Sequence, residues 1–200
     1  MKHIPEKIIM ATANRGKVAE IRDLVKALPV EFLCLADLPD YPHVVEDGAT
    51  FEENALIKAR ALTAATSLVS IADDSGLCVD ALDGRPGVLS ARYGGQNTSD
   101  LDKCRLILEE LHDVPDASRT ARFVCAIALV APDGEEHVFR GVCEGRITRE
   151  LRGTGGFGYD PVFFYDEAGC TFAEMDRESK NRVSHRGQAL KRLFEFLNAL

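Results

Sequence analysis

Residues 68–76, LVSIADDSG, decide the fold class. The first five are apolar or small with β-branched members, which predicts a short buried strand that stops where the acidic residues begin. Asp73 and Asp74 then lie at the carboxyl end of a strand, where α/β sheets usually bind their ligands.

The segments before this strand alternate between strand and helix patterns. Residues 8–11 read as a short buried strand and residues 30–35 as a second strand, and a turn at residues 14–16 leads from the first strand into a helix. Thr50 and Glu53 have the spacing of a capping box, which predicts a helix from there to about Ser67. The apolar face of the first helix is expected to contain Val18, Ile21, Leu24, Val25 and Leu28.

In the second half of the chain, the sequence predicts two long strands joined directly by a hairpin and not through a helix. A Gly- and Pro-rich loop is expected over residues 83–95, and Ser99 is expected to cap a helix that runs to about Leu111. Residues 121–131 and 136–147 read as long strands joined by a hairpin at residues 132–134. A short strand over residues 162–165 and a last helix from about Ser184 follow. The whole pattern predicts one α/β domain, residues 1–200, with a mixed β-sheet.

The composition of the chain excludes several classes of function. The chain has 200 residues, 46% of them hydrophobic, and a formal net charge of −8. An acidic protein without a basic stripe argues against nucleic-acid or anionic-membrane partners, so an anionic substrate would need a bound cation or converging basic side chains. The six cysteines form no metal-binding or disulfide pattern, and no signal-peptide or membrane-spanning stretch is visible. We expect a reduced, cytoplasmic protein.

The acidic pair after the strand points to a metal. Buried carboxylates are costly unless a partner neutralises them, and Mg²⁺ prefers such oxygen ligands. Since consecutive strand residues face opposite sides, one of Asp73 and Asp74 is expected to reach the ion. The acidic loop at residues 46–48 offers a second ligand, although acids also favour a helix start by themselves. A solvated acidic turn is the alternative for the pair.

Two further segments have features of phosphate sites. Residues 12–17, TANRGK, lie between a strand and a helix, where backbone N–H groups and Lys17 attract phosphate, although an ordinary turn would look the same. Near the C-terminus, a cap at Ser184 would place His185 and Arg186 at the positive end of a helix dipole. A bound anion would offset this crowding of cations with Lys180, since unit charges 4 Å apart interact by about 4 kcal/mol at a dielectric of 20. A solvated basic helix start is the alternative.

Residues 153–161, GTGGFGYDP, combine four glycines with two aromatic residues. Such a loop can close around a flat ligand, with Phe157 or Tyr159 stacking and Asp160 accepting hydrogen bonds. A tight connection before the next strand is the simpler alternative.

Taken together, six blocks resemble the inosine/xanthosine triphosphate pyrophosphatase family, in order and over nearly the whole chain. The resemblance implies an α/β fold with an elongated mixed sheet flanked by helices, and two lobes around a central nucleotide cleft. It also implies a Mg²⁺-dependent homodimer that hydrolyses ITP, dITP and XTP to the monophosphate and pyrophosphate, which clears deaminated purines from the nucleotide pool. The blocks are residues 12–17, 46–55, 72–76, 86–93, 155–161 and 184–190.

The resemblance also assigns roles by motif. Asp74 would be the proton acceptor and a Mg²⁺ ligand, with Glu46 as the second metal carboxylate ahead of Asp47 and Asp73. The first loop would bind phosphate, residues 157–160 with His185 and Arg186 would hold the purine, and Lys180 would contact the nucleotide. The expected substrate-binding residues are Thr12, Ala13, Asn14, Arg15, Gly16, Lys17, Ser75, Phe157, Gly158, Tyr159, Asp160, Lys180, His185 and Arg186.

Two departures from the family pattern matter. Ala13 stands where many relatives have Gly, and Val45 occupies the position of the first Glu in the acidic loop. Two rival functions are a pyrophosphatase for pyrimidine or other modified nucleotides and a nucleotide sensor without hydrolysis. Carboxylates at the end of a buried strand favour catalysis over sensing.

Overall fold

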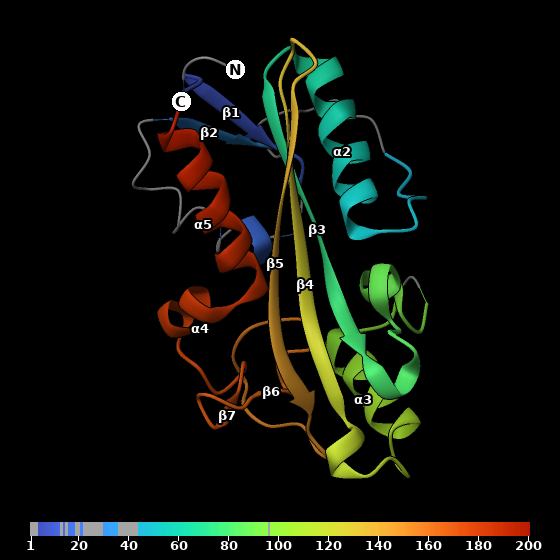
Figure 1. Cartoon of the computed structure of the whole chain (residues 1–200). Coiled ribbons are helices and arrows are strands. Elements are labelled where there is room, and N and C mark those ends of the chain that lie inside the picture. Colours follow the sequence, from blue (N-terminus) through green and yellow to red (C-terminus); the bar gives the residue numbers. More distant parts are fainter. Residues whose placement is uncertain are drawn as a thin grey trace. The chain divides into compact units, whose positions relative to one another are not determined.

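The computed structural model describes residues 4–12, 14, 16–18, 21, 30–35, 44–95 and 97–200. Its strands form one sheet in the order β2-β1-β3-β4-β5-β6-β7, flanked by helices (Figure 1). The chain divides into two compact units. Unit 1 comprises residues 1–74, 125–141 and 186–200, and unit 2 comprises residues 75–124 and 142–185. The predicted α/β fold with a mixed sheet is confirmed.

Parallel pairing organises the first strands of unit 1. β1 (Lys7–Met10) lies between β2 (Glu31–Cys34) and β3 (Val69–Val79) and is parallel to both. Parallel strands need a crossover connection, and the segment that leads from β2 across β1 to β3 contains α2 (Phe51–Thr66). The register places Ile8 opposite Val69, so the strand–helix–strand pattern predicted from the sequence is present.

Unit 1 buries both faces of its strands. Ile8 and Ile71 pack in one apolar cluster with the inward residues of α5 (His185–Asn198), whereas the alternate residues Ile9 and Ala72 are buried on the other face. Figure 1 shows α2 and α5 on opposite sides of these strands. The α5 residues in the cluster follow a helical period: Ala189, Leu190, Leu193 and Leu197.

Helix α2 starts as the sequence predicts. The Thr50 side chain accepts a hydrogen bond from the N–H of Glu53 at 3.1 Å, and the Glu53 carboxylate accepts one from the N–H of Thr50 at 3.3 Å. The helix ends at Thr66, and the C-cap residue Ser67 takes the left-handed conformation with φ 56°. This reciprocal cap satisfies donors that a helix start otherwise leaves open.

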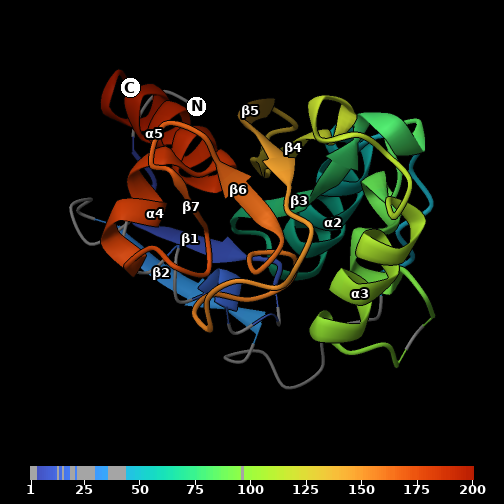
Figure 2. The same cartoon turned by 90° about the horizontal axis from the view of Figure 1, so that it is seen from below.

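Unit 2 is organised around antiparallel pairs. β6 (Phe163–Tyr165) pairs with the end of β5 (Glu136–Ile147) and with β7 (Cys170–Thr171). Viewed along the strands, α3 (Asp100–Glu110) and α4 (Arg177–Val183) lie on opposite sides of them (Figure 2). The apolar core contains Leu77, Val79, Ile107, Leu111, Phe123, Phe163 and Phe172.

A tight turn joins β4 (Thr120–Val130) to β5. The Ala131 N–H donates to the Glu135 carbonyl at 2.9 Å, and Gly134 takes φ +89°, a conformation that favours glycine. The hairpin predicted at residues 132–134 is therefore present.

Several elements differ from the sequence-based expectations, among them β7, which was not predicted. β3 does not stop at Ala72 but continues to Val79, because its later residues Leu77 and Val79 are buried in the core of unit 2. Helix α4 was not predicted, and the segment expected as a loop over residues 83–95 contains the 3-10 helix Gly87–Arg92, which follows another at Asp80–Leu82. In the first predicted helix, residues 16–18 and 21 are helical, whereas Leu24, Val25 and Leu28 lie outside the described residues.

Within the described part of the chain, no helix is both long and apolar enough to cross a membrane. None of the six cysteines, all of which the structure describes, forms a disulfide, and burial raises the pKa of Cys104, Cys125 and Cys143 to about 12. These three thiols stay protonated at neutral pH.

Candidate active site

The paired carboxylates of β3 face different partners in unit 1. Asp73 Oδ2 lies 2.9 Å from Lys17 Nζ and 3.3 Å from Arg186 Nε, whereas Asp74 Oδ1 lies 3.2 Å from Lys58 Nζ. This divergence is what alternation along a continuing strand requires. The expectation that the two carboxylates would face opposite sides is confirmed.

Asp73 is the anion of a buried ion-pair cluster. Burial alone would raise the pKa of its carboxyl group, but Lys17, Arg186 and Lys58 outweigh burial and hold that pKa well below its usual range. Asp73 is therefore ionised at every physiological pH. It holds Lys17 and Arg186 in place through a single oxygen, Oδ2.

Asp74 has the opposite electrostatic character. Its side chain is mostly buried, and this burial raises its pKa above the usual aspartate value despite the ammonium group of Lys58. Among the described residues, none donates a hydrogen bond to the buried Asp74 Oδ2. A carboxylate with a raised pKa and an open oxygen is suited to accept a proton or to bind a cation.

Lys58, which the sequence analysis missed, connects Asp74 to the acidic loop. Its Nζ lies 2.8 Å from Glu46 Oε2 and 3.2 Å from Asp74 Oδ1. Burial would lower the pKa of this amine, but Asp74, Asp73 and Glu46 raise it, so Lys58 is a cation held between carboxylates. The available signal was its position on α2, one helical turn after Asn54 on the face that carries buried residues.

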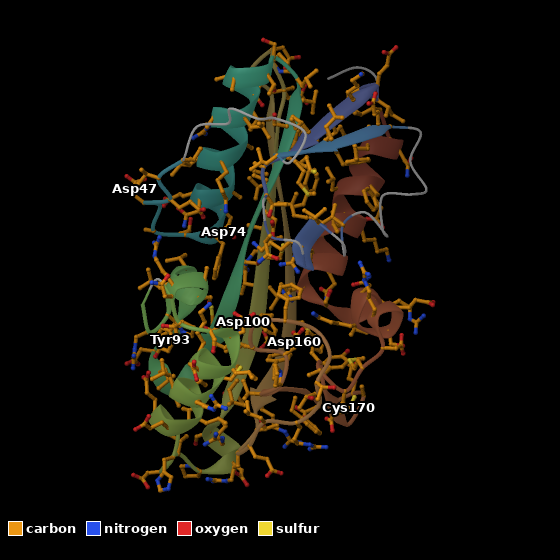
Figure 3. The ribbon with its side chains drawn as sticks, turned by 180° about the vertical axis from the view of Figure 1, so that it is seen from behind. Asp47, Asp74, Tyr93, Asp100, Asp160 and Cys170 are labelled. Atoms are coloured by element: carbon orange, nitrogen blue, oxygen red, sulfur yellow. The ribbon has the colours of Figure 1, made fainter. Side chains whose placement is uncertain are left out.

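The loop that carries Glu46 is fixed by the start of α2. The Asn54 carboxamide accepts from the Gly48 N–H at 2.9 Å and donates to the Gly48 carbonyl at 3.4 Å. A Cβ at Gly48 would lie 2.8 Å from Asn54 Oδ1, so this close approach requires glycine. Asp47 is exposed on the outer side of the loop, away from Asp74 (Figure 3). Of the candidate second carboxylates, Glu46 is the one that shares a cation with Asp74.

The residues of this cluster fit Mg²⁺. No group of three or more His, Cys, Asp or Glu side chains in the described ranges is arranged to hold a metal ion. Mg²⁺ needs fewer, because one or two carboxylates together with waters and substrate phosphates complete its shell. Glu46 and Asp74 meet that requirement: both face one cation, and one Asp74 oxygen is open.

The loop after β1 is organised by Asn14. Its Oδ1 accepts hydrogen bonds from the N–H groups of Gly16 at 2.9 Å and Lys17 at 3.2 Å, and its own N–H donates to Thr12 Oγ1 at 3.2 Å. Two of the N–H groups expected to meet phosphate are thus used by the helix cap. The side chain of Lys17 is the part of this loop that joins the carboxylate cluster, and Ala13 and Arg15 lie outside the described residues.

Unit 2 contains a second cluster, built from residues 153–161, the glycine-rich loop, and from α4. Asp160 Oδ2 lies 2.7 Å from Lys180 Nζ and accepts a hydrogen bond from the Phe157 N–H at 2.8 Å. Both side chains of the ion pair are buried, and the ammonium group lies 4.6 Å from the centre of the Phe157 ring. Lys180 thus joins a carboxylate to an aromatic face.

Two glycines allow the glycine-rich loop to adopt this shape. A Cβ at Gly156, which has φ +70°, would lie 2.0 Å from Asp160 Oδ2. Gly158, with φ +63°, donates its N–H to Asp100 Oδ2 at 2.8 Å, and its carbonyl accepts from Cys104 Sγ at 3.4 Å. Figure 3 shows Asp100 near Asp160. Helix α3 therefore anchors the loop, a role that the sequence analysis did not assign.

Of the two aromatic residues that the sequence offered for stacking, only Phe157 is available. Tyr159 is buried in the core of unit 2, and its hydroxyl donates to the Ser90 carbonyl at 2.8 Å. Burial raises the pKa of Tyr159, so the hydroxyl stays protonated. Tyr159 anchors the loop, whereas the half-buried Phe157 keeps part of its ring accessible.

The remaining predicted residues divide between the units. His185 is buried in unit 2 and stacks on Phe123 with ring centroids 4.6 Å apart and an 11° interplanar angle. Arg186, the next residue, belongs to the unit 1 cluster through Asp73. Ser75 continues β3 after Asp74, and its contact with substrate stays a prediction, as does capping of α5 by Ser184.

Comparisons with known proteins agree over nearly the full chain. A model of the Ham1 family matches residues 8–196. A Geobacter sulfurreducens protein named dITP/XTP pyrophosphatase is 53% identical over 191 residues, which cover 96% of this chain and 96% of that protein. A Desulforamulus reducens protein of the same name is 48% identical, covering 97% of this chain and 96% of its own.

Solved structures support the same relationship. A HAM1 protein from Coxiella burnetii matches with a TM-score of 0.90 and 42% identity, over 97% of this chain and 99% of its own. The Staphylococcus aureus Ham1 protein matches with a TM-score of 0.88 and 38% identity, over 96% of this chain and 98% of its own. With the family model spanning almost all of its residues, this chain belongs to the Ham1 family.

Proposed function

We propose that this protein is a nucleoside triphosphate pyrophosphatase that hydrolyses ITP, dITP and XTP to the monophosphate and pyrophosphate, and that its 200 residues act as one catalytic domain. The curated relatives named dITP/XTP pyrophosphatase support this substrate class. Within the molecule, the observation that carries the proposal is Asp74, a buried carboxylate with a raised pKa and an open oxygen beside Lys58 and Glu46. The role of the protein in this proposal is to remove deaminated purines from the nucleotide pool.

Asp74 acts as the proton acceptor in this proposal. Its raised pKa makes it a stronger base than an exposed aspartate, while Lys58 favours the ionised form that can take the proton from an attacking water. Lys17 supplies positive charge next to the phosphates. Asp73 holds Lys17 and Arg186 through ion pairs and is a positioning residue.

Glu46 and Asp74 would hold Mg²⁺, the proposed cofactor, and the unbonded Asp74 oxygen would serve as metal ligand or as proton acceptor, not as both in the same step. The chemistry that bound Mg²⁺ supplies is neutralisation of phosphate charge and a better pyrophosphate leaving group. Lys58 already places a cation between the same two carboxylates, which supports their affinity for positive charge. For a triphosphate bound to a protein with net charge −8, such local cations offset the repulsion.

The second cluster would bind the base. Phe157 offers a ring face for stacking, and Lys180 is held against that ring for contact with the nucleotide. His185 and Arg186 are proposed as donors to the 6-oxo group of hypoxanthine and xanthine. Adenine carries an amino group at this position, and an unmatched buried donor discriminates strongly between such bases.

The proposed function also includes an oligomeric state, a cellular compartment and a class of partner. We infer a homodimer in the cytoplasm with a purine nucleoside triphosphate as substrate and no nucleic acid or membrane partner. Six cysteines without a disulfide suit a reducing compartment, and the acidic net charge disfavours polyanionic surfaces.

The test is a product assay on the full chain. ITP, dITP, XTP, GTP and ATP are each incubated with enzyme and Mg²⁺, and pyrophosphate and orthophosphate are measured separately, with EDTA added in a parallel series. The proposal expects pyrophosphate from ITP, dITP and XTP, much slower release from ATP and GTP, and loss of activity with EDTA. Orthophosphate as the main product, or tight nucleotide binding without any product, would contradict it.

A further inference from the structure

Unit 2 contains a cavity of about 290 Å³ that none of the roles above explains. It lies around the end of β5 and the segment that follows, and its lining includes the four arginines Arg119, Arg146, Arg149 and Arg152. The same lining has only two carboxylates, from Asp116 and Glu150. In a chain with net charge −8, this local excess of guanidinium groups is unusual.

Arg119 is the buried arginine of the cavity lining, and hydrogen bonds hold its side chain in place. The side chain is buried, and its Nε and Nη2 donate to the carbonyls of Ile147 at 2.9 Å and Thr148 at 2.7 Å. A third bond goes from Nη1 to the Leu111 carbonyl. These partners are neutral carbonyls, so they orient the guanidinium group without cancelling its charge. Burial is the main cause that lowers the pKa of Arg119, and the nearby Arg149 lowers it further whereas Asp116 raises it.

Arg146 and Arg152 are oriented by the ring of Phe164. Their guanidinium carbons lie 4.7 and 5.6 Å from its centre. Within the described structure, each has one carboxylate partner reached through a single nitrogen: Asp166 at 2.8 Å and Glu174 at 3.2 Å. A guanidinium group has five N–H donors, so both arginines keep donors for a ligand.

The existing ion pairs do not block an anion. The Arg146–Asp166 pair has side chains that are 49% and 58% exposed, and pairs of this kind contribute little net stability. Arg149 pairs with Asp116, which is also exposed. A ligand with several negative oxygens can therefore replace these carboxylates, and the ring of Phe164 keeps two of the arginines in position at a lower entropic cost.

We propose that this arginine cavity is a binding site for a small anion with phosphoryl groups, of which inorganic pyrophosphate is the simplest. Planar guanidinium groups pair with phosphate oxygens in a bidentate fashion, and several of them around one cavity suit more than one phosphoryl group. The volume of about 290 Å³ lies just below the usual range for ligand pockets, about 300–1,000 Å³, which favours a small anion over a whole nucleoside triphosphate. The proposal does not depend on the proposed catalytic function.

The test is arginine footprinting of the full chain. The protein is treated with phenylglyoxal, with and without inorganic pyrophosphate, in EDTA and at constant ionic strength set with NaCl, and each arginine is quantified by peptide mass spectrometry. We expect pyrophosphate to slow modification of Arg146 and Arg152 at least fivefold in a saturable way. Arg122, an ion-paired arginine of unit 2 outside the cavity lining, is the internal control and should not change.

Variants give the second readout. Equilibrium dialysis with labelled pyrophosphate should show one fewer bound anion per chain for Arg146→Gln/Arg152→Gln, whereas Arg122→Gln should match the original protein. Stronger protection by a nucleoside monophosphate than by pyrophosphate would still support a phosphoryl site and would name the nucleotide as the source. Neither measurement requires turnover, so the result is separate from that of the product assay.

Three results would overturn the proposal. The first is equal modification of Arg146 and Arg152 with pyrophosphate and with NaCl, or unchanged stoichiometry in the double variant. The second is equal protection by succinate, which would assign the cavity to anions in general. The third is protection that increases with protein concentration without any added anion, which would mean that a second copy of the chain covers the cavity.

Discussion

The two units each contain a lysine–aspartate pair whose carboxylate is buried, but the surroundings of the pair differ. In unit 1, Asp73 joins Lys17 to Arg186, and Lys58 links the neighbouring Asp74 to further negative charge. In unit 2, Asp160 joins Lys180 to the backbone of the glycine-rich loop, and an aromatic ring covers the ammonium group. The first environment suits phosphates and a metal ion, and the second suits a flat base.

Asp74→Asn should cause the largest effect. Loss of a general base lowers kcat/KM by about 10²–10⁴-fold, while asparagine keeps the volume of the side chain and should leave the thermal midpoint nearly unchanged. The matched control is Asp47→Asn in the exposed acidic loop, which should retain activity. Steady-state kinetics with ITP and a thermal melt check both; near-normal turnover of Asp74→Asn would remove unit 1 from the chemistry.

Asp73→Asn should destabilise the protein more than Asp160→Asn. The first change leaves the partly buried Lys17 and the buried Arg186 without their carboxylate, and the second leaves only the buried Lys180, while breaking a buried pair costs about 3–5 kcal/mol. Urea unfolding at pH 7 measures both losses. Equal losses would show that the two clusters do not differ in this way.

The stability difference between the original protein and Asp73→Asn should depend on pH. The pKa of Asp73 is lowered on folding, so its stabilisation is present above the unfolded value of about 3.9 and is lost as the pH falls below it. The stability gap between the original protein and Asp73→Asn should therefore narrow below about pH 4. Urea unfolding at a series of pH values measures this gap, and a constant gap would contradict the assigned ion pairs.

Arg186→Ala tests which cluster a boundary residue serves. Arg186 contacts Asp73 in unit 1, yet its proposed role is to recognise the base. We expect the ITP-to-ATP ratio of kcat/KM to fall about tenfold, equivalent to about 1.4 kcal/mol. Arg192→Ala, an exposed arginine on the same helix, is the control. An unchanged ratio with a uniform loss of activity would place Arg186 with the phosphate-binding residues instead.

The two helix caps provide the smallest contrast. Thr50→Ala and Ser99→Ala should each cost about 1 kcal/mol of stability, because each removes one side-chain cap. The Thr50 cap adjoins the loop of Glu46, so its loss should raise the Mg²⁺ concentration needed for half-maximal activity. The Ser99 cap precedes Asp100, so its loss should raise KM for ITP; kinetics at varied Mg²⁺ and ITP would detect either the expected pattern or its reversal.

Much of the fold follows from local signals. The capping box at Thr50, the apolar alternation in the strands and the turn with Gly134 each depend on residues close in sequence, and each element is present. Opposite facing of Asp73 and Asp74 also follows from strand geometry alone. The predicted end of β3 was wrong because the negative charges within the strand are neutralised by residues far away in the sequence. Arg186, which contacts Asp73, is separated from it by 113 residues.

The site was predicted less completely than the fold. Lys58 reaches Asp74 only because α2 packs beside β3, and the anchoring of Gly158 by Asp100 spans 58 residues. Tyr159 looked like a stacking residue because its burial depends on the core of unit 2, which sequence spacing does not report. Local patterns identified residue types with the right chemistry, whereas tertiary packing decided which of them meet.

The most direct test of the division between the clusters is a comparison of Lys58→Met with Phe157→Leu in steady-state hydrolysis of ITP. Loss of the Lys58 cation should lower kcat, because its contacts are with the proposed base and metal ligand. Loss of the Phe157 ring should raise KM about tenfold with little change in kcat, since base stacking contributes about 1–3 kcal/mol of binding. A fall in kcat for Phe157→Leu without a change in KM, or a rise in KM alone for Lys58→Met, would contradict the account.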